Sequence, residues 1–339
     1  MATATQTVRS QRAVRAQTHT NVLKEMIVHW SDYLYVLPAL IIMGIVILYP
    51  LIKVIWLSFH FTSVYHPELG EQFVGLDNYR DAVNDEHFGL VVRNTLVWTF
   101  FSTVFSIALG MIAAILLSRP IRFRGFFRSV LFIPYVISAV TAAFVWKWMY
   151  HSDFGVISGL LMDLHIIKSP IKFIDSTTLV MPSLIVANVW KEFPFAMIML
   201  LAGIQTIPDQ LYNAAKIDGA GRWRRFTDIT IPQLMPVLTI TSILLIIANI
   251  NAFTFVWILT GGGPAYHSQI FITHVYSVAF VGSPHFELAS ALGVMVVVAM
   301  MIFAVFYVRL LTHETRSRHV TEGDAGEGSA VTTAPSTAG

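Results

Sequence analysis

The sequence predicts an all-α membrane protein with six transmembrane helices. Of its 339 residues, 55% are hydrophobic and only 12% are charged, whereas a soluble domain carries about 25% charged residues. Apolar stretches of about 20 residues, the length that a bilayer core requires, recur along the chain between polar segments. The net charge of +2 is too small to indicate nucleic acid, so composition predicts the lipid bilayer as the partner.

The apolar stretches define the predicted order of the chain. A polar cytoplasmic tail, residues 1–32, precedes a transmembrane domain at 33–311, and a disordered cytoplasmic tail follows at 312–339. Pro134 is expected to kink the third span. The six predicted spans are residues 33–59, 91–118, 129–150, 177–201, 233–260 and 287–311.

The distribution of basic residues predicts the orientation of these spans. The connections at 60–90, 151–176 and 261–286 contain few lysines and arginines, whereas the two tails and the connections at 119–128 and 205–232 are rich in them. Cytoplasmic loops carry an excess of Lys and Arg. Both termini and the 205–232 connection are therefore expected in the cytoplasm of a multi-pass cell-membrane protein. The basic residues on the predicted external side are Arg80, Lys168 and Lys172.

Residues 211–232 form a polar, charge-dense interval in the apolar second half of the chain. Just before it, Pro208 can open a helix and Asp209 suits the first turn. Two alanines, Ala214 and Ala215, then give this helix little side-chain bulk. The interval therefore predicts a short cytoplasmic helix with a small-residue face.

The same interval contains signals that end one helix and start the next. Gly219 and Gly221 are expected to end the short helix, and Pro232 lies where the next apolar run starts, a position that the first turn of a helix permits. A compact helix between two spans suggests a projecting element that another protein binds. The alternative is an amphipathic loop whose Trp223 and arginines lie on lipid headgroups.

The fourth predicted span contains polar residues near its middle. Asn188, Glu192 and Phe195 fall at i, i+4 and i+7, on one face of a helix. Charged groups at membrane depth usually face a cavity or a partner, and an amide with an aromatic ring suits sugar hydroxyls and sugar rings. This face is a candidate lining for a polar passage. The alternative is that Lys191 and Glu192 neutralise each other or snorkel at a helix interface.

The fifth predicted span contains a second candidate group. Asn249 and Asn251 are two residues apart, so they cannot share one face of a regular helix. A break in the helix would reconcile them as passage residues, with Phe253 as a stacking partner. The alternative is that each asparagine bonds to a neighbouring helix.

Signatures of catalysis and of nucleotide binding are missing from the sequence. It has no Gly-x-x-x-x-Gly-Lys-Ser/Thr loop, no cysteine and no histidine pair at metal-ligand spacing. The spans offer no convincing catalytic pair. The chain is thus not expected to be an enzyme or to hold a metal or cofactor. A stand-alone secondary transporter or channel stays open as an alternative, with Lys191 and Glu192 as its one candidate ion relay.

Several strings resemble a known family. Asn213-Ala-Ala215, then Gly219, then Ile229-x-Ile-Pro232 resemble the EAA motif of permease subunits in binding-protein-dependent ABC importers. Phe73-Val-Gly-Leu-Asp-Asn-Tyr79 and Leu259-Thr-Gly-Gly-Gly-Pro264 are similar to recurring strings of the carbohydrate (maltose-type) branch. Together these strings cover about residues 33–311.

The resemblance implies a type I ABC importer permease fold with a cytoplasmic coupling helix seated in an ATPase subunit. It also implies four partners: a second homologous permease, two ATP-binding subunits and an extracytoplasmic solute-binding protein. ATP would be used by those subunits, and this chain would move a sugar or sugar-like solute into the cytoplasm by alternating access.

The resemblance also assigns roles to residues. Asn213 stands where the motif has Glu, so no salt bridge to the ATPase is assumed there, and Glu192 stands where the family more often has a small residue. The implied coupling residues are Asn213, Ala214, Ala215, Asp218, Gly219, Ala220, Arg222, Ile229 and Pro232. The implied passage residues are Asn188, Glu192, Phe195, Asn249, Asn251 and Phe253.

Overall fold

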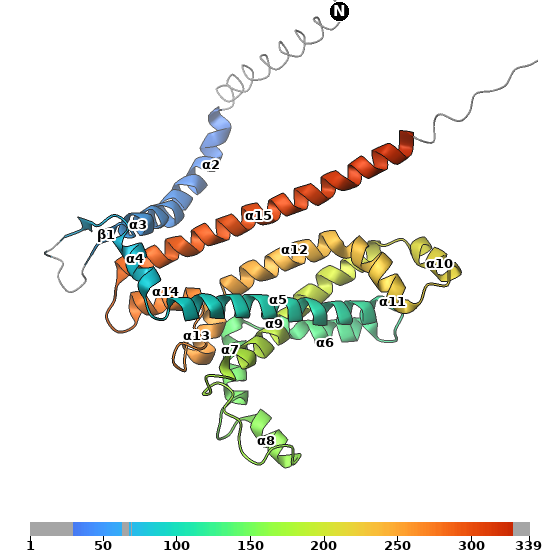
Figure 1. Cartoon of the computed structure of the whole chain (residues 1–339), viewed down its shortest axis with the longest axis horizontal. Coiled ribbons are helices and arrows are strands. Elements are labelled where there is room, and N and C mark those ends of the chain that lie inside the picture. Colours follow the sequence, from blue (N-terminus) through green and yellow to red (C-terminus); the bar gives the residue numbers. More distant parts are fainter. Residues whose placement is uncertain (1–29, 63–67, 69, 328–339) are drawn as a thin grey trace, which may run out of the picture. The chain divides into compact units, whose positions relative to one another are not determined.

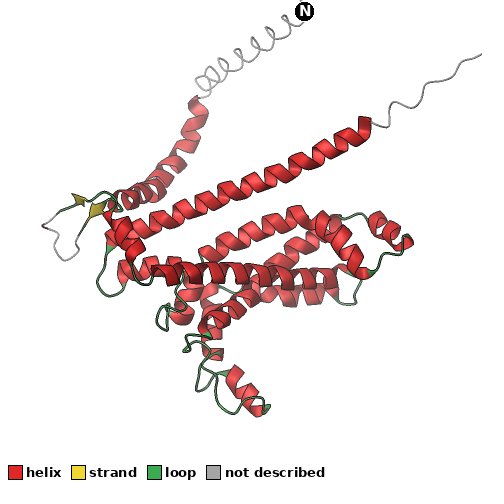
Figure 2. Cartoon of the chain, in the orientation of Figure 1, coloured by secondary structure: helices red, strands yellow, loops and turns green. Residues whose placement is uncertain are grey.

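The computed structural model describes residues 30–62, 68 and 70–327, and these residues are predominantly helical (Figure 2). The chain divides into two units, Met1–Leu57 and Ser58–Gly339. The predicted tail at 1–32 lies almost wholly outside the described residues. The predicted tail at 312–339 lies partly outside them, and its disorder stays a prediction.

The first unit contains one apolar helical segment. Residues Tyr35–Leu57 are long and apolar enough to cross a membrane, which agrees with the first predicted span. A π-helical turn precedes Pro50, whose ring would crowd the carbonyl group four residues earlier in a regular helix. The elements are α2 (Trp30–Met43), η1 (Gly44–Leu48) and α3 (Tyr49–Leu57).

The second unit is built on four long apolar helical segments (Figure 1). Among the described residues of the whole chain, five helices could cross a membrane by length and composition, or six if the bent pair of α6 and α7 forms one span. This confirms the predicted all-α membrane fold. The helices concerned are α5 (Phe88–Ser118), α6 (Arg124–Val136), α7 (Ala139–Met149), α9 (Val180–Thr206), α12 (Ile231–Ile250) and α15 (Phe286–Glu327).

The third predicted span is bent, but the predicted position of its kink is wrong. Pro134 lies inside α6, and the axis turns by 92° between α6 and α7. The turn falls at Ile137 and Ser138, whose ψ angles of 134° and 147° are extended. Ser138 favours this geometry because its hydroxyl accepts a hydrogen bond from the Thr141 N–H at 3.2 Å and caps α7.

The predicted external connections contain short elements. The connection at 151–176 contains a short helix, α8. An apolar helix at α14 was not predicted, because the interval from 229 to 286 contains no charged residue that would mark where a span ends and a loop helix begins. The short elements are β1 (His60–Phe61), β2 (Gln72–Phe73, antiparallel to β1), α4 (Asp77–Asn84), α8 (Val156–Asp163) and α14 (Phe271–Phe280).

Helices α5 and α9 pack along each other more extensively than any other described pair. They approach closely at Gly110, where an added Cβ would lie 2.6 Å from Ala196 Cβ and 2.8 Å from Met197 N. Further along α9, a Cβ on Gly203 would lie 2.7 Å from Leu234 Cδ2 of α12. Small residues thus allow three helices to approach closely, as in many membrane helix interfaces.

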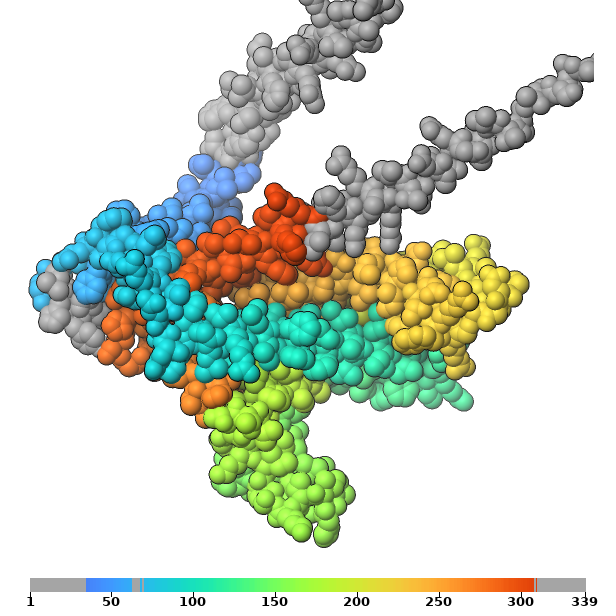
Figure 3. Space-filling model, in the orientation of Figure 1, coloured from blue at the N-terminus to red at the C-terminus, as the bar shows by residue number. Residues whose placement is uncertain are grey.

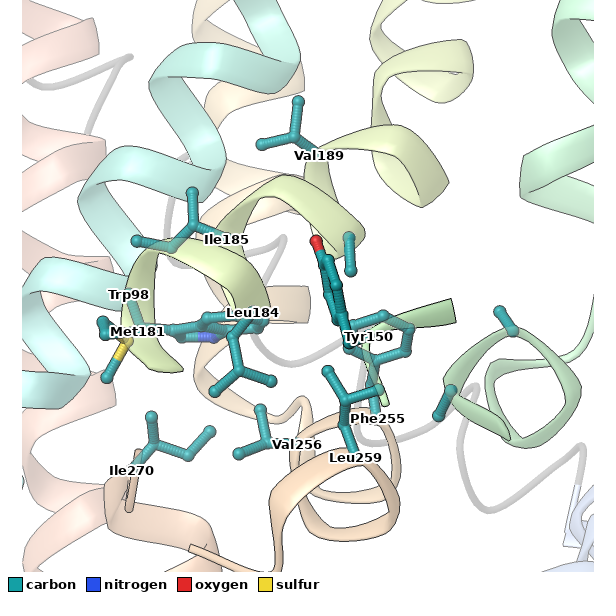
Figure 4. Packing of buried hydrophobic residues seen from close by; sticks show 13 residues of the cluster. Trp98, Tyr150, Met181, Leu184, Ile185, Val189, Phe255, Val256, Leu259 and Ile270 are labelled. Carbon is teal, nitrogen blue, oxygen red and sulfur yellow. The ribbon is translucent and has the colours of Figure 1, made fainter. Parts of the chain in front are cut away.

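Two buried apolar clusters lie along these helices. The first joins α5, α9 and α13 (Phe253–Thr260), and Figure 4 shows its side chains converging from these elements. Its fully buried members include Trp98, Leu184 and Leu259. The second cluster lies where α5, α9 and α12 pack together further along, and it includes Met197 and Leu234. The clusters hold the three helices together at two levels.

We expect Gly110→Ala to lower the stability of the chain, because the added methyl group would push α5 away from α9. Such overpacking costs about 1–3 kcal/mol. Gly89→Ala is the matched control, since Gly89 also lies in α5 and its Cβ would meet no atom within 4 Å. Thermal unfolding of the purified chain in detergent, followed by tryptophan fluorescence, measures both. A Gly110→Ala protein as stable as the Gly89→Ala protein would contradict this close contact.

Candidate functional site

Helix α10 (Asp209–Ile217) projects from one end of the second unit, next to α11 (Arg222–Arg225) (Figures 1 and 3). Pro208 precedes its first residue and Asp209 lies in its first turn, as predicted. Asn213 and Ala214 are exposed, and Ile217 is 87% exposed. An apolar side chain this open on a short helix provides surface that a second protein could cover.

The turn that ends α10 is a complete Schellman motif. The Gly219 N–H donates to Lys216 O at 3.1 Å, and the Ala220 N–H donates to Ala215 O at 2.8 Å. Gly219 has a φ of +74°, in the left-handed region that favours glycine. Asp218 is the last residue before this turn and is exposed. The predicted turn at Gly219 is therefore confirmed, while its part in coupling stays a prediction.

The helix that follows starts earlier than predicted. Instead of beginning at Pro232, it begins at Arg222 and continues to Ile250 as one apolar segment. Pro232 is tolerated because the π-helical turn η3 (Phe226–Thr230) precedes it, and the Ile231 N–H donates to Phe226 O. Residues Arg222–Ile250, which comprise α11, η3 and α12, thus form one continuous helical segment, hereafter the rod.

Side chains attach this projection to the membrane helices. The Tyr212 hydroxyl and Thr230 Oγ1 are 2.9 Å apart, which joins α10 to the rod. Tyr212, Phe226 and Ile229 pack against the second buried cluster. Asn213 accepts a hydrogen bond from Lys216 Nζ at 3.2 Å, so within the described residues its side chain bonds inside α10.

The asparagines of the fourth and fifth spans meet in the interior. Asn188 Nδ2 donates to Asn249 Oδ1 at 2.7 Å, and Asn249 Nδ2 donates to Thr103 Oγ1 at 3.2 Å. Trp98 Nε1 donates to the Asn249 carbonyl at 2.9 Å. Asn188 and Asn249 are 3% and 1% exposed. For Asn249, this geometry matches the alternative in which the asparagine bonds to a neighbouring helix.

The predicted break in the fifth span is present. Helix α12 ends at Ile250, and α13 begins at Phe253. Asn251 is exposed, and its Nδ2 donates to the Ile247 carbonyl of its own helix at 2.9 Å. The Phe253 ring lies 4.8 Å from the ring of Tyr276. The break therefore separates Asn251 from the buried Asn249 instead of bringing both to one surface.

Glu192 and Phe195 lie together beside a residue that sequence reasoning missed. Lys191 Nζ is 3.6 Å from Glu192 Oε1, as the neutralising alternative predicted. Lys191 Nζ also lies 5.5 Å from the ring centre of Tyr135 in α6, and Phe195 stacks on that ring at 5.6 Å. The one sequence signal for Tyr135 was its place beside Pro134 in the third span.

The six predicted passage residues therefore form three groups. Asn188 and Asn249 bond directly. Glu192 pairs with Lys191, which lies over the Tyr135 ring on which Phe195 stacks. The third pair lies at the helix break. No described hydrogen bond joins one group to another. Their role in binding a solute stays a prediction.

Comparison with known proteins identifies the family. The family model for the binding-protein-dependent transport system inner membrane component matches residues 106–317, which include α10, its turn and the rod that follows. The chain belongs to this family. The resemblance drawn from the motif at 213–232 is confirmed, and the protein is a permease subunit of an ABC importer.

Relatives of this permease include named sugar permeases. It is 31% identical over 278 residues to the trehalose/maltose transport system permease protein MalF of Thermococcus litoralis, which covers 82% of this chain and 92% of the relative. It is 31% identical over 282 residues to the lactose transport system permease protein LacF of Rhizobium radiobacter, which covers 82% and 93%.

A solved structure shares the fold of this permease. The crystal structure of a bacterial ABC transporter involved in the import of the acidic polysaccharide alginate contains a chain that matches with a TM-score of 0.72 and 22% identity. The match covers 86% of this chain and 98% of the other. It confirms the type I ABC importer permease fold.

We expect the Asn188→Ala and Asn249→Ala substitutions to be energetically coupled, because each removes one end of the same hydrogen bond. A double-mutant cycle on thermal stability should give a coupling energy of about 0.6 kcal/mol, and no more than about 1.7 kcal/mol. Asn188→Ala combined with Asn251→Ala is the matched control and should be additive, since among the described residues the Asn251 side chain bonds to Ile247 of its own helix and not to Asn188. Coupling of equal size in both cycles would contradict this contact.

Proposed function

We propose that this permease subunit moves a sugar or sugar-like solute into the cytoplasm by alternating access, driven by ATP hydrolysis in separate subunits. The observation that carries the proposal is an exposed helix, α10, joined through the Gly219 turn to a rod that continues into the membrane helix α12. The solute class is supported by relatives named for trehalose, maltose and lactose transport.

The proposed assembly contains a second homologous permease, two ATP-binding subunits and an extracytoplasmic solute-binding protein. One structural neighbour, matched with a TM-score of 0.69 and 23% identity, is a bacterial alginate ABC transporter in complex with a periplasmic protein that holds an alginate pentasaccharide. In the proposed assembly this chain binds no cofactor itself, and ATP acts on it only through α10.

We propose a multi-pass topology with both termini in the cytoplasm. Support comes from the excess of arginines at 119–128 and 205–232 over the other connections. Arg119 and Arg222 line one cavity, so the two arginine-rich connections lie at the same end of the second unit. That end carries α10, which would put α10 within reach of a cytoplasmic ATPase.

In the proposed mechanism, movement passes from α10 to the rod and then to α9. Closure of the ATPase dimer would displace α10, and the Tyr212–Thr230 contact would carry this displacement to the rod. Because the rod includes α12, the movement would reach α9 through the Asn188–Asn249 bond. The spans would then alternate between inward-facing and outward-facing states whose populations the nucleotide shifts.

The proposed solute contacts are the six predicted passage residues, Asn188, Glu192, Phe195, Asn249, Asn251 and Phe253. Phe195 offers a ring for stacking and Glu192 a carboxylate for hydroxyl groups. Lys191 pairs with Glu192, as expected if the two charges neutralise each other. The alternative of a stand-alone secondary transporter is therefore disfavoured, as it is by membership of a binding-protein-dependent family.

We expect Gly219→Val to uncouple uptake from ATP hydrolysis, because a β-branched residue is strained at a φ of +74° and would disrupt the turn after α10. Gly221→Val is the matched control, since Gly221 has a φ of −64° and open space around it. Uptake of labelled maltose, trehalose and lactose, together with ATP hydrolysis by the assembled transporter, measures the effect. Uptake at the wild-type rate in the Gly219→Val transporter would exclude the coupling role.

We expect Phe195→Ala and Glu192→Gln to reduce uptake of the same labelled sugars at least about tenfold, corresponding to about 1.4 kcal/mol of lost interaction. The ATPase subunits should still co-purify, because both residues lie in α9, away from α10. Phe193→Ala is the control, as Phe193 lies in the same helix but lines a separate apolar cavity. If Phe193→Ala reduces uptake as strongly as Phe195→Ala, the passage assignment is wrong.

A further inference from the structure

A cavity of about 540 Å³ lies at the end of the second unit that carries α10 and α11. Its walls come from the C-terminal end of α5, the connection from α9 to α10, and the start of the rod. Three arginine side chains line it: Arg119, Arg222 and Arg225. These residues are far apart in the sequence, and the fold brings them to one space.

The three guanidinium groups have no partner among the described residues. None forms an ion pair or a side-chain hydrogen bond there, and the buried Nε of Arg225 is an unpaired donor. Arg224 differs, because its Nε lies 3.3 Å from Asp228 Oδ2 and it does not line the cavity. A buried unpaired donor is unfavourable unless a ligand supplies the acceptor.

The remaining lining is mixed, with an apolar side. Ile115, Ile204 and Phe226 contribute hydrocarbon surface, whereas Asp209 is the one carboxylate in the lining. The charged lining groups therefore carry a net positive charge. A ligand that fits this cavity needs an anionic group for the arginines and an apolar part for the opposite wall.

The ends of candidate membrane spans surround the cavity. Helix α5 ends at Ser118, α9 ends at Thr206, and the apolar rod begins at Arg222, so three candidate spans terminate around it. Trp223, next to Arg222, is 75% exposed, and tryptophan is enriched at membrane interfaces. A phospholipid headgroup is the abundant anion at this depth.

We propose that this cavity binds the phosphate headgroup of an anionic phospholipid. The planar guanidinium groups match phosphate oxygens in charge and geometry, and basic pockets between membrane helices bind lipid headgroups of this kind. One water molecule occupies about 30 Å³, so 540 Å³ holds far more than a bare phosphate ion. The bound lipid joins α5, α9 and the base of the rod beside α10.

The experiment uses the full-length chain in nanodiscs of dioleoylphosphatidylcholine, with and without dioleoylphosphatidylglycerol. After extraction into detergent, native mass spectrometry counts the phosphatidylglycerol molecules that stay bound. We expect Arg222→Gln, Arg225→Gln and Arg119→Gln each to weaken retention about fivefold, the effect of one basic residue near a lipid surface. The three arginines lie on two separate elements, so misfolding of one variant leaves another to test the site.

Arg224→Gln is the matched control, since it removes the same charge from the same short helix outside the cavity. Retention unchanged in this variant supports the site. Equal loss in Arg224→Gln overturns it in favour of diffuse surface charge, as does equal retention of phosphatidylcholine and phosphatidylglycerol by the wild type.

Two further measurements separate other sources of an anion. Displacement of the lipid by millimolar sodium phosphate overturns the lipid proposal in favour of a free-anion site, whereas resistance to phosphate supports it. If the cavity variants keep the lipid but lose the co-purifying ATPase subunit, the arginines bind an acidic surface of that partner, and the lipid proposal is wrong.

Discussion

The contact between α5 and α9 at Gly110 is the constraint on which the second unit depends. Inside a bilayer, helices gain little from hydrophobic burial, because lipid chains are as apolar as leucine side chains. Association therefore requires close packing, and Gly110 against Ala196 provides it. The same two helices contribute side chains to both buried clusters, and they supply Trp98, Thr103 and Asn188 to the hydrogen bonds around Asn249. Helix α12 joins a pair that is already in contact.

The second organising feature is the way in which helices continue past proline. Pro50 and Pro232 each lie two residues after a π-helical turn. A proline ring crowds the carbonyl four residues earlier, and in both cases that carbonyl lies within the wide turn. The helix therefore continues where a regular helix would break. For the permease, this keeps residues Arg222–Ile250 one continuous helical segment despite Pro232.

Much of the fold could be predicted from local chemistry. Apolar length gave the spans, Pro208 and Asp209 marked the start of α10, and Gly219 marked its turn. Pro134 and Pro232 both lie within continuous helical segments, so a proline alone does not mark where a helix bends or begins. The contacts of the candidate passage residues were harder to predict, because helical spacing indicates which side chains share a face but not which residues that face contacts. Tyr135 and Thr103 approach from other helices, which spacing within one span cannot reveal.

The hydrogen bond between Asn188 and Asn249 has a consequence for any solute that enters between α9 and α12. Both amides bond to protein groups and are almost fully buried, so a solute hydroxyl group that takes the place of either partner replaces a hydrogen bond that already exists. Such an exchange conserves the number of hydrogen bonds and changes the free energy little. A pathway built on exchange of this kind would therefore bind its solute weakly.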